Sequence, residues 1–132
     1  MNKVVARFAD GRMTKGTTAD FSPEKELFHM SVAATPSGVT SLVIHMRELK
    51  ALYFVKDFAG DPRRADRNEF DPSNPPIMRP ISVTFVDGEV LVGTTAGYQS
   101  GRPGFFLQPA DASSNIERCY VLVAATREIR FL

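Results

Sequence analysis

An ungapped internal repeat is the feature that most limits how this chain of 132 residues can fold. The segment 4–55 aligns with the segment 81–132 at a constant offset of 77, which is 81 minus 4. The phrase "FADGRMTKGTTADF" at Phe8 therefore returns as "FVDGEVLVGTTAGY" at Phe85. A repeat of this length indicates a folding unit copied whole. Because roughly 50 residues lie near the lower limit for a self-supporting core, we expect the two copies to support each other.

Each copy begins with the pattern of a β-hairpin. Apolar residues alternate with other residues in "VVARF" from Val4 and in "ISVTF" from Ile81. This is the period of a strand with one buried face. Asp-Gly then follows in both copies, and it is typical of a tight turn. Asp10 and Asp87 are therefore predicted to form turns rather than a catalytic carboxylate pair.

The remainder of each copy predicts three further strands. Gly16 and Gly93 lie inside the second strand, where glycine usually marks a bend or a bulge. The short gap before the last strand fits one 3₁₀ turn. Small barrels close by bending their long strands in this way. The sequence thus predicts an all-β fold, a tandem repeat of two small five-stranded barrels packed with pseudo-twofold symmetry.

The fourth predicted strand is apolar at consecutive positions in both copies, from Leu42 to Ile44 and from Tyr120 to Ala125. A strand with one wet face alternates, so these runs predict that both faces are covered. We expect the copies to pack on one another or to exchange strands, with the last strands sealing edges that would otherwise pair with other chains.

Three regions follow from the repeat. Residues 1–55 form the first barrel, residues 81–132 form the second, and residues 56–80 join them. This linker holds five of the nine prolines, which deny backbone donors to strands and helices, so it is predicted to be an extended strap. Its apolar residues indicate that it lies on the barrels; they are Phe58, Phe70, Ile77 and Met78.

Each half resembles an Sm-like, SH3-type small barrel, whose first motif also runs apolar-x-apolar-x-Asp-Gly, then Gly, then an aromatic residue. The whole chain also resembles a bacterial family found alone or fused to PilZ and signalling domains. Two segments carry that resemblance, "LKALYFVKDFAGD" from Leu49 and "DGEVLVGTTAGYQSGRPGFFLQPADASSNIERCYVL" from Asp87. It implies a role in bacterial signalling and brings no assigned activity with it.

Candidate catalytic residues are few. His29 and His45 lie in predicted strands, and Cys119 lies beside the apolar run "YVLVAA". A Cys-His pair is an alternative, but a buried inert thiol and two strand histidines are the favoured interpretation. No spacing resembles a zinc site. We therefore expect a protein that is not an enzyme and that holds no metal and no cofactor.

An Sm-like RNA-binding protein is one alternative function. Sm-type proteins hold RNA with an Asn in the loop after strand two and an Arg-Gly pair between strands four and five. At these places the chain reads Ser22-Pro23-Glu24-Lys25, Arg47-Glu48 and Ala124-Ala125. The net charge of +1 also gives no long-range attraction to phosphates. Nucleic acid is therefore an unlikely partner.

A cyclic-dinucleotide sensor is the second alternative. Arg63-x-x-x-Arg67 resembles the arginine motif of PilZ domains, which clamp guanine and phosphate with guanidinium groups. PilZ domains add an Asp-x-Ser-x-x-Gly strand. The nearest matches are "DFSPEK" at Asp20 and "DPSNPP" at Asp71, and both lack the glycine. Solvated arginines in a charge-balanced linker are the favoured interpretation.

A non-catalytic binding module that acts by protein–protein interaction is the prediction that remains. Loops that differ between the copies, such as "SPEKE" and "QSGRPG", would give one scaffold two different faces. The candidate ligand or partner residues in loops are Arg47, Arg63, Arg67 and Arg102. The start "MNKVVARFAD" lacks an apolar signal core, and a single cysteine fits a reducing compartment, so the expected location is the cytoplasm. The protein partner is unidentified, a homo-oligomer is possible, and no membrane insertion is expected.

Overall fold

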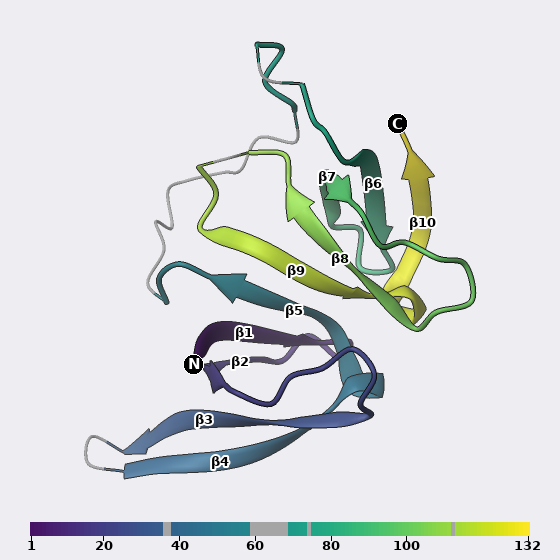
Figure 1. Cartoon of the computed structure of the whole chain (residues 1–132). Coiled ribbons are helices and arrows are strands. Elements are labelled where there is room, and N and C mark those ends of the chain that lie inside the picture. The colour runs from purple at the N-terminus through teal and green to yellow at the C-terminus, as the bar shows by residue number, and fades with distance from the viewer. Residues whose placement is uncertain (36–37, 59–68, 74, 112) are drawn as a thin grey trace.

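Ten antiparallel strands form one open sheet in the computed structural model, which describes residues 1–35, 38–58, 69–73, 75–111 and 113–132 (Figure 1). The described ranges contain no α-helix. The elements of the first half are β1 (Asn2–Phe8), β2 (Met13–Thr18), β3 (Leu27–Thr35), β4 (Gly38–His45), the 3₁₀ turn η1 (Met46–Glu48) and β5 (Leu49–Val55). Those of the second half are β6 (Arg79–Phe85), β7 (Val90–Thr95), β8 (Gly104–Pro109), β9 (Ile116–Leu122), the 3₁₀ turn η2 (Val123–Ala125) and β10 (Thr126–Phe131). The predicted all-β class is therefore confirmed.

The offset of 77 residues holds in the pairing of strands as well as in the sequence. Val4 lies opposite Gly16 in the β1–β2 hairpin, and Ile81 lies opposite Gly93 in the β6–β7 hairpin. The last strand of each half, β5 or β10, returns to pair with the first strand, β1 or β6. The strand order is thus β5-β1-β2-β3-β4 in one half and β10-β6-β7-β8-β9 in the other.

The two halves join where β5 pairs with β9, so the whole sheet runs β10-β6-β7-β8-β9-β5-β1-β2-β3-β4. In Figure 1 these two strands cross the middle of the molecule side by side. The sheet is not closed, so the prediction of two separate barrels is not confirmed. A twofold axis would pair β10 with β4 as well, yet these strands lie at opposite ends of the sheet. The predicted pseudo-twofold packing therefore does not describe the observed sheet.

β5 is buried along its whole length because it contributes to two hydrophobic cores. Leu52 and Phe54 lie in the first core with residues of β1, β3 and β4, while Ala51 and Tyr53 lie in the second core with residues of β6, β8 and β9. Alternate side chains of a strand point to opposite faces, so one strand can serve both cores. The halves are therefore built as one packed body.

The prediction that the fourth strands are covered on both faces holds for β9 and is wrong for β4. β9 lies between β8 and β5, and its residues from Cys119 to Leu122 are buried. β4 is an end strand, and its Leu42 and Val43 side chains are 36% and 51% exposed. The last strands of the two halves also differ. β5 lies inside the sheet, between β9 and β1, whereas β10 is an edge strand.

The strand glycines are required by close approach of two backbones. A Cβ atom on Gly16 would lie 2.5 Å from the carbonyl oxygen of Ser31, and one on Gly93 would lie 2.0 Å from that of Gln108. Both distances are too short for any side chain. Glycine is therefore required at these positions because the backbones of β2 and β7 lie very close to β3 and β8 where the strands pair.

The Asp-Gly turns form as predicted. Gly11 and Gly88 have φ angles of 97° and 95°, which residues with a side chain adopt only under strain. Asp10 accepts a hydrogen bond from the backbone N–H of Arg12 at 3.0 Å, and the carboxylate of Asp87 accepts one from the backbone N–H of Glu89 at 3.0 Å. Both aspartates are thus turn formers.

Asp87 also ties the two halves together. The Nζ of Lys50, which lies at the start of β5, donates to the Asp87 carboxylate at 2.7 Å and to the Glu89 carboxylate. The same ammonium lies 4.6 Å from the centroid of the Phe85 ring. Lys50 is only 7% exposed, so its charge is compensated inside the junction by residues of the other half.

The linker contacts the sheet where it begins. Phe58 packs against the second core, and its carbonyl oxygen accepts a hydrogen bond from the Lys15 ammonium at 2.9 Å. Ile77, by contrast, is fully exposed, so the prediction that it lies on the protein is wrong. Residues 59–68 lie outside the described part of the chain. Within the described ranges, no helix has the length and apolar character needed to cross a membrane.

Candidate functional site: a groove between the two halves

Two adjoining cavities of about 890 and 810 Å³ lie where the halves meet. Both are lined by Pro23 and Glu24 of the first half and by Arg102, Pro103 and Tyr120 of the second. We call the combined space the groove. One arm runs along β8 and β9, and the other runs toward η1. Neither half alone supplies both walls.

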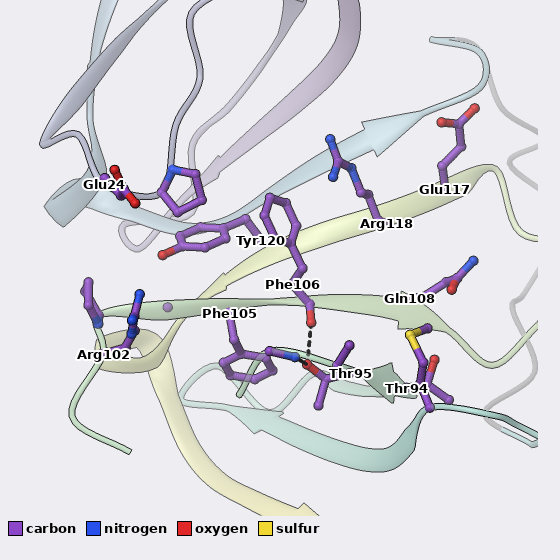
Figure 2. Close-up of a pocket in the computed structure, with 16 residues that line it drawn as sticks. Glu24, Thr94, Thr95, Arg102, Phe105, Phe106, Gln108, Glu117, Arg118 and Tyr120 are labelled. Carbon is purple, nitrogen blue, oxygen red and sulfur yellow. Dashed lines mark hydrogen bonds between the residues drawn. The ribbon is translucent and has the colours of Figure 1, made fainter. Parts of the chain in front are cut away.

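Aromatic rings form the floor of the groove (Figure 2). The Phe106 and Tyr120 ring centroids lie 5.1 Å apart. Phe21 of the first half, which lines neither cavity, lies 5.4 Å from the Tyr120 centroid in an edge-on contact. Phe21 also contacts Phe28 and Phe54, at 5.2 and 5.6 Å between centroids. Edge-on aromatic pairs stabilise one another beyond simple burial. The rings that line the groove thus belong to the second half, and Phe21 and Phe54 of the first half pack against them.

Gly104 leaves space for the Tyr120 ring. A Cβ atom at this position would lie 2.6 Å from the Cε2 and Cζ atoms of Tyr120. Glycine is the residue that permits such close approach of a ring to the backbone. The Gly104 that ends "GRPG" therefore shapes the floor as well as beginning β8.

Arg118 lies on this aromatic floor. Its guanidinium carbon is 4.4 Å from the Phe54 ring centroid and 4.6 Å from the Phe106 ring centroid. The residue is exposed, and its guanidinium has no carboxylate partner among the described residues. Stacking on two rings fixes the guanidinium plane while leaving its N–H donors free for a ligand.

Arg102 supplies a second guanidinium from the loop before β8. Its Nε donates a hydrogen bond of 2.9 Å to the Gln99 side-chain oxygen, and its backbone N–H donates to the Gln99 carbonyl at 3.3 Å. The Tyr120 hydroxyl points toward Arg102 and Glu24 (Figure 2). Burial raises the pKa of Tyr120, and the positive charge of Arg102 partly offsets this effect. The phenol is therefore a hydrogen-bond donor at neutral pH.

The facing wall comes from the loop after β2. Its backbone turns at Ser22, whose carbonyl accepts a hydrogen bond from the N–H of Lys25 at 3.1 Å. Asp20, before this turn, accepts hydrogen bonds from the backbone N–H and the Nδ1 of His29 at 2.9 and 2.7 Å. These bonds lower the pKa of Asp20. The histidine thus anchors the loop that presents Pro23 and Glu24.

The structure brings two of the four predicted arginines to the groove. Arg102 lines both arms, and Arg47 lines the arm beside η1. Arg63 and Arg67 lie outside the described residues. Sequence reasoning missed Arg118 and Tyr120 because they lie in a strand that reads as core. A usable signal was the difference from the equivalent residues of the first copy, Ser41 and Val43 (118 and 120 minus 77).

Cys119 is not a reactive thiol in this structure. The residue is fully buried in the second core, and burial raises the pKa of the Cys119 thiol to about 12. The thiol is therefore protonated at neutral pH, as the predicted inert interpretation requires. Among the described residues, no group of three or more His, Cys, Asp or Glu side chains could hold a metal ion.

Comparison with known proteins identifies a protein family. No curated protein and no solved structure matches the chain. A family model described as a family of unknown function matches residues 1–132, which is the whole chain. The chain therefore belongs to that family, DUF6982.

Proposed function

We propose that this protein is a non-catalytic binding module, and that the groove holds an extended peptide segment of a protein partner. The segment would carry an acidic side chain next to an aromatic or aliphatic one. The proposal places the module in bacterial signalling, as the resemblance to a PilZ-associated family implies, and in the cytoplasm, as the single cysteine leads us to expect.

The observation that carries the proposal is the position of Arg118. An exposed guanidinium lies over two aromatic rings, with no carboxylate partner in the described residues, in a groove that both halves build. A ligand carboxylate could accept two parallel N–H bonds from it, while an apolar neighbour packs on Phe106 and Pro103. Burying a charge-assisted pair at such a fixed site gives both affinity and orientation.

Charge favours a peptide over a nucleic acid. Glu24 and Glu117 line the groove together with Arg102 and Arg118, so the lining has mixed sign. A polyphosphate chain would meet those carboxylates, whereas a peptide can place a basic group beside them. The RNA-binding and cyclic-dinucleotide alternatives are outcomes that the experiment below can reveal.

The arginine and tyrosine side chains of the groove favour binding over catalysis. Guanidinium groups stay protonated at all physiological pH values, and the raised pKa of Tyr120 keeps its phenol protonated. Such groups donate hydrogen bonds well and act poorly as nucleophiles or bases.

The test is a fluorescence-polarisation screen of labelled ten-residue peptides that vary only in one acidic and one aromatic position. Acidic–aromatic peptides should bind the wild type, and Arg118→Ala should weaken that binding about tenfold, because a bond to a charged group is lost. Arg127→Ala removes an exposed arginine of β10 that lines neither cavity and is the matched control. Oligouridine and cyclic diguanylate serve as competing probes. If those probes bind in an Arg118-dependent manner while the peptides do not, the peptide proposal is overturned.

A further inference from the structure

We infer that the two end strands of the sheet pair with each other between molecules, so that β4 of one copy lies antiparallel to β10 of a second copy. This head-to-tail contact would repeat the junction that β5 and β9 make inside the chain. The occupant of the free β4 edge is therefore a second copy of this protein. The inference does not depend on the proposed peptide groove.

The internal junction supplies the geometry. It joins the fifth strand of the first half to the fourth strand of the second. At the offset of 77, β4 is the counterpart of β9, and β10 is the counterpart of β5. The two counterparts lie at opposite ends of the sheet, and among the described residues each pairs with a strand on one side alone. The molecule thus forms this contact once, between β5 and β9, and leaves the two equivalent strands, β10 and β4, at the edges of the sheet.

Side chains exposed on β4 match ones that the internal junction buries. Leu42 is 36% exposed, while its counterpart Cys119 is fully buried. Val43 is 51% exposed, while its counterpart Tyr120 is 2% exposed. An edge strand with exposed apolar residues and free backbone donors and acceptors is a template for pairing. The strand that covers these positions in the second half is β5.

The register of the proposed contact follows from the internal one: 77 is added to each residue number of β5, and 77 is subtracted from each residue number of β9. Leu52 opposite Tyr120 becomes Ile129 opposite Val43. Val55 opposite Ile116 becomes Leu132 opposite Val39. Both new pairs are apolar, and Leu132 and Val39 are 63% and 75% exposed in the single chain. Apolar cross-strand pairs are the unit that stabilises a sheet.

Two differences make the proposed contact weaker than the internal one. Ala51 and Tyr53 of β5 are replaced in β10 by Glu128 and Arg130, whose side chains form an ion pair of 3.3 Å. Charged residues on an edge oppose indiscriminate pairing, and their desolvation reduces the gain on association. The contact is therefore reversible and depends on concentration. Because it joins unlike edges, repetition gives a ring if the rotation closes and a filament if it does not.

The first experiment measures molar mass against protein concentration by light scattering after size exclusion. Glu128→Ala with Arg130→Tyr gives β10 the residues of β5 at these two positions and should lower the concentration of half-association at least tenfold. Val43→Lys in that background should restore the monomer. Val86→Lys, a change at a 66% exposed apolar residue in the β6–β7 turn, should leave association unaltered. Far-ultraviolet circular dichroism verifies the fold of each variant.

The second experiment tests the register by disulfide trapping. Val43→Cys and Ile129→Cys proteins are mixed under mild oxidation, with the buried Cys119 left in place. Directly opposite strand positions lie within disulfide reach, so the mixed disulfide should exceed either homodimer. A predominant Val43→Cys homodimer would show symmetric β4 pairing and overturn the inference. So would a wild type and a Glu128→Ala, Arg130→Tyr variant that both stay monomeric at every concentration tested.

Discussion

Gly93 lies at a position where the fold leaves no space for a side chain. Its position faces the Gln108 carbonyl and the Leu107 side chain, at 2.0 and 2.7 Å from where a Cβ would lie. Backbone atoms cannot move aside as the end of a flexible side chain can. The close pairing of β7 with β8 therefore depends on this residue being glycine.

Gly93→Ala should lower the free energy of unfolding by about 2 kcal/mol or more, because the added methyl group forces two strands apart. Gly97→Ala is the matched control, since a Cβ there meets no atom within 4 Å. Its effect should stay within about 0.5 kcal/mol. Urea denaturation followed by circular dichroism measures both, and equal losses in the two variants would contradict the argument.

Asp87 should make stability depend on pH. The hydrogen bond from Lys50 is the main cause that lowers the pKa of Asp87, and the bond from the Glu89 N–H adds to it. A carboxyl whose pKa falls on folding stabilises the protein above its unfolded pKa of about 4. That contribution is lost as the pH falls through the lower pKa of the folded state. We expect unfolding experiments to show decreasing stability below about pH 4.

Lys50→Met is the control for this pH dependence. The variant keeps a long apolar side chain and removes the charge, so the Asp87 carboxyl should titrate closer to its usual value. Carboxyl resonances followed by NMR would report the midpoint directly. An Asp87 midpoint that stays unchanged in the variant would mean that Lys50 does not set it.

At the scale of single residues, sequence reasoning identified turn residues better than site residues. Asp10 and Asp87 were predictable because a turn needs only local chemistry. Arg102 was predictable because it lies in a loop that differs between the copies. Arg118 was not, since its role depends on rings contributed by β5 and β8, which are remote in the sequence.

At the scale of elements, equivalent strands of the two halves differ in how far they are buried. β5 is covered on both faces, whereas β10 has an exposed side, although both pair with the first strand of their half. The alternation of residue types gave the strands correctly, because it reflects the period of the backbone. The same alternation could not predict that β4 is exposed and β9 buried, because the burial of each strand depends on which strand lies beside it.

The equivalent residues Leu52 and Ile129 provide a test of this difference. Leu52 is completely buried in the first core, while Ile129 is half-buried at the end of the second. Leu52→Ala should therefore cost about 3 kcal/mol of unfolding free energy, and Ile129→Ala about 1 kcal/mol. Chemical denaturation under identical buffers gives both values. Equal losses of unfolding free energy would mean that the two residues contribute equally to stability, whatever their burial.

At the scale of the whole molecule, the two halves share their hydrophobic cores. Tyr120 and Leu122 of the second half lie in the first core, and Val5 and Tyr53 of the first half lie in the second. Sequence reasoning predicted that the halves support each other. It predicted closed barrels, whereas the structure has one open sheet. The apolar residues of the last strand suit pairing within a half as well as pairing with the other half, so the sequence pattern does not distinguish the two arrangements.

Shared cores imply that the chain should unfold in a single transition. Differential scanning calorimetry should give one peak, with equal calorimetric and van't Hoff enthalpies. Leu52→Ala should lower the midpoint of that one peak without splitting it. Two peaks, of which the variant moves only one, would show that the halves unfold independently.

The burial of β5 on both faces has a consequence for how the two copies can diverge. A substitution in β5 disturbs two interiors at once, so few alternatives are acceptable there. Its counterpart β10 has one side open to solvent, and it carries Glu128 and Arg130 where β5 carries Ala51 and Tyr53. A strand between two interiors thus carries alanine and tyrosine at positions where the more open strand carries an acid and a base.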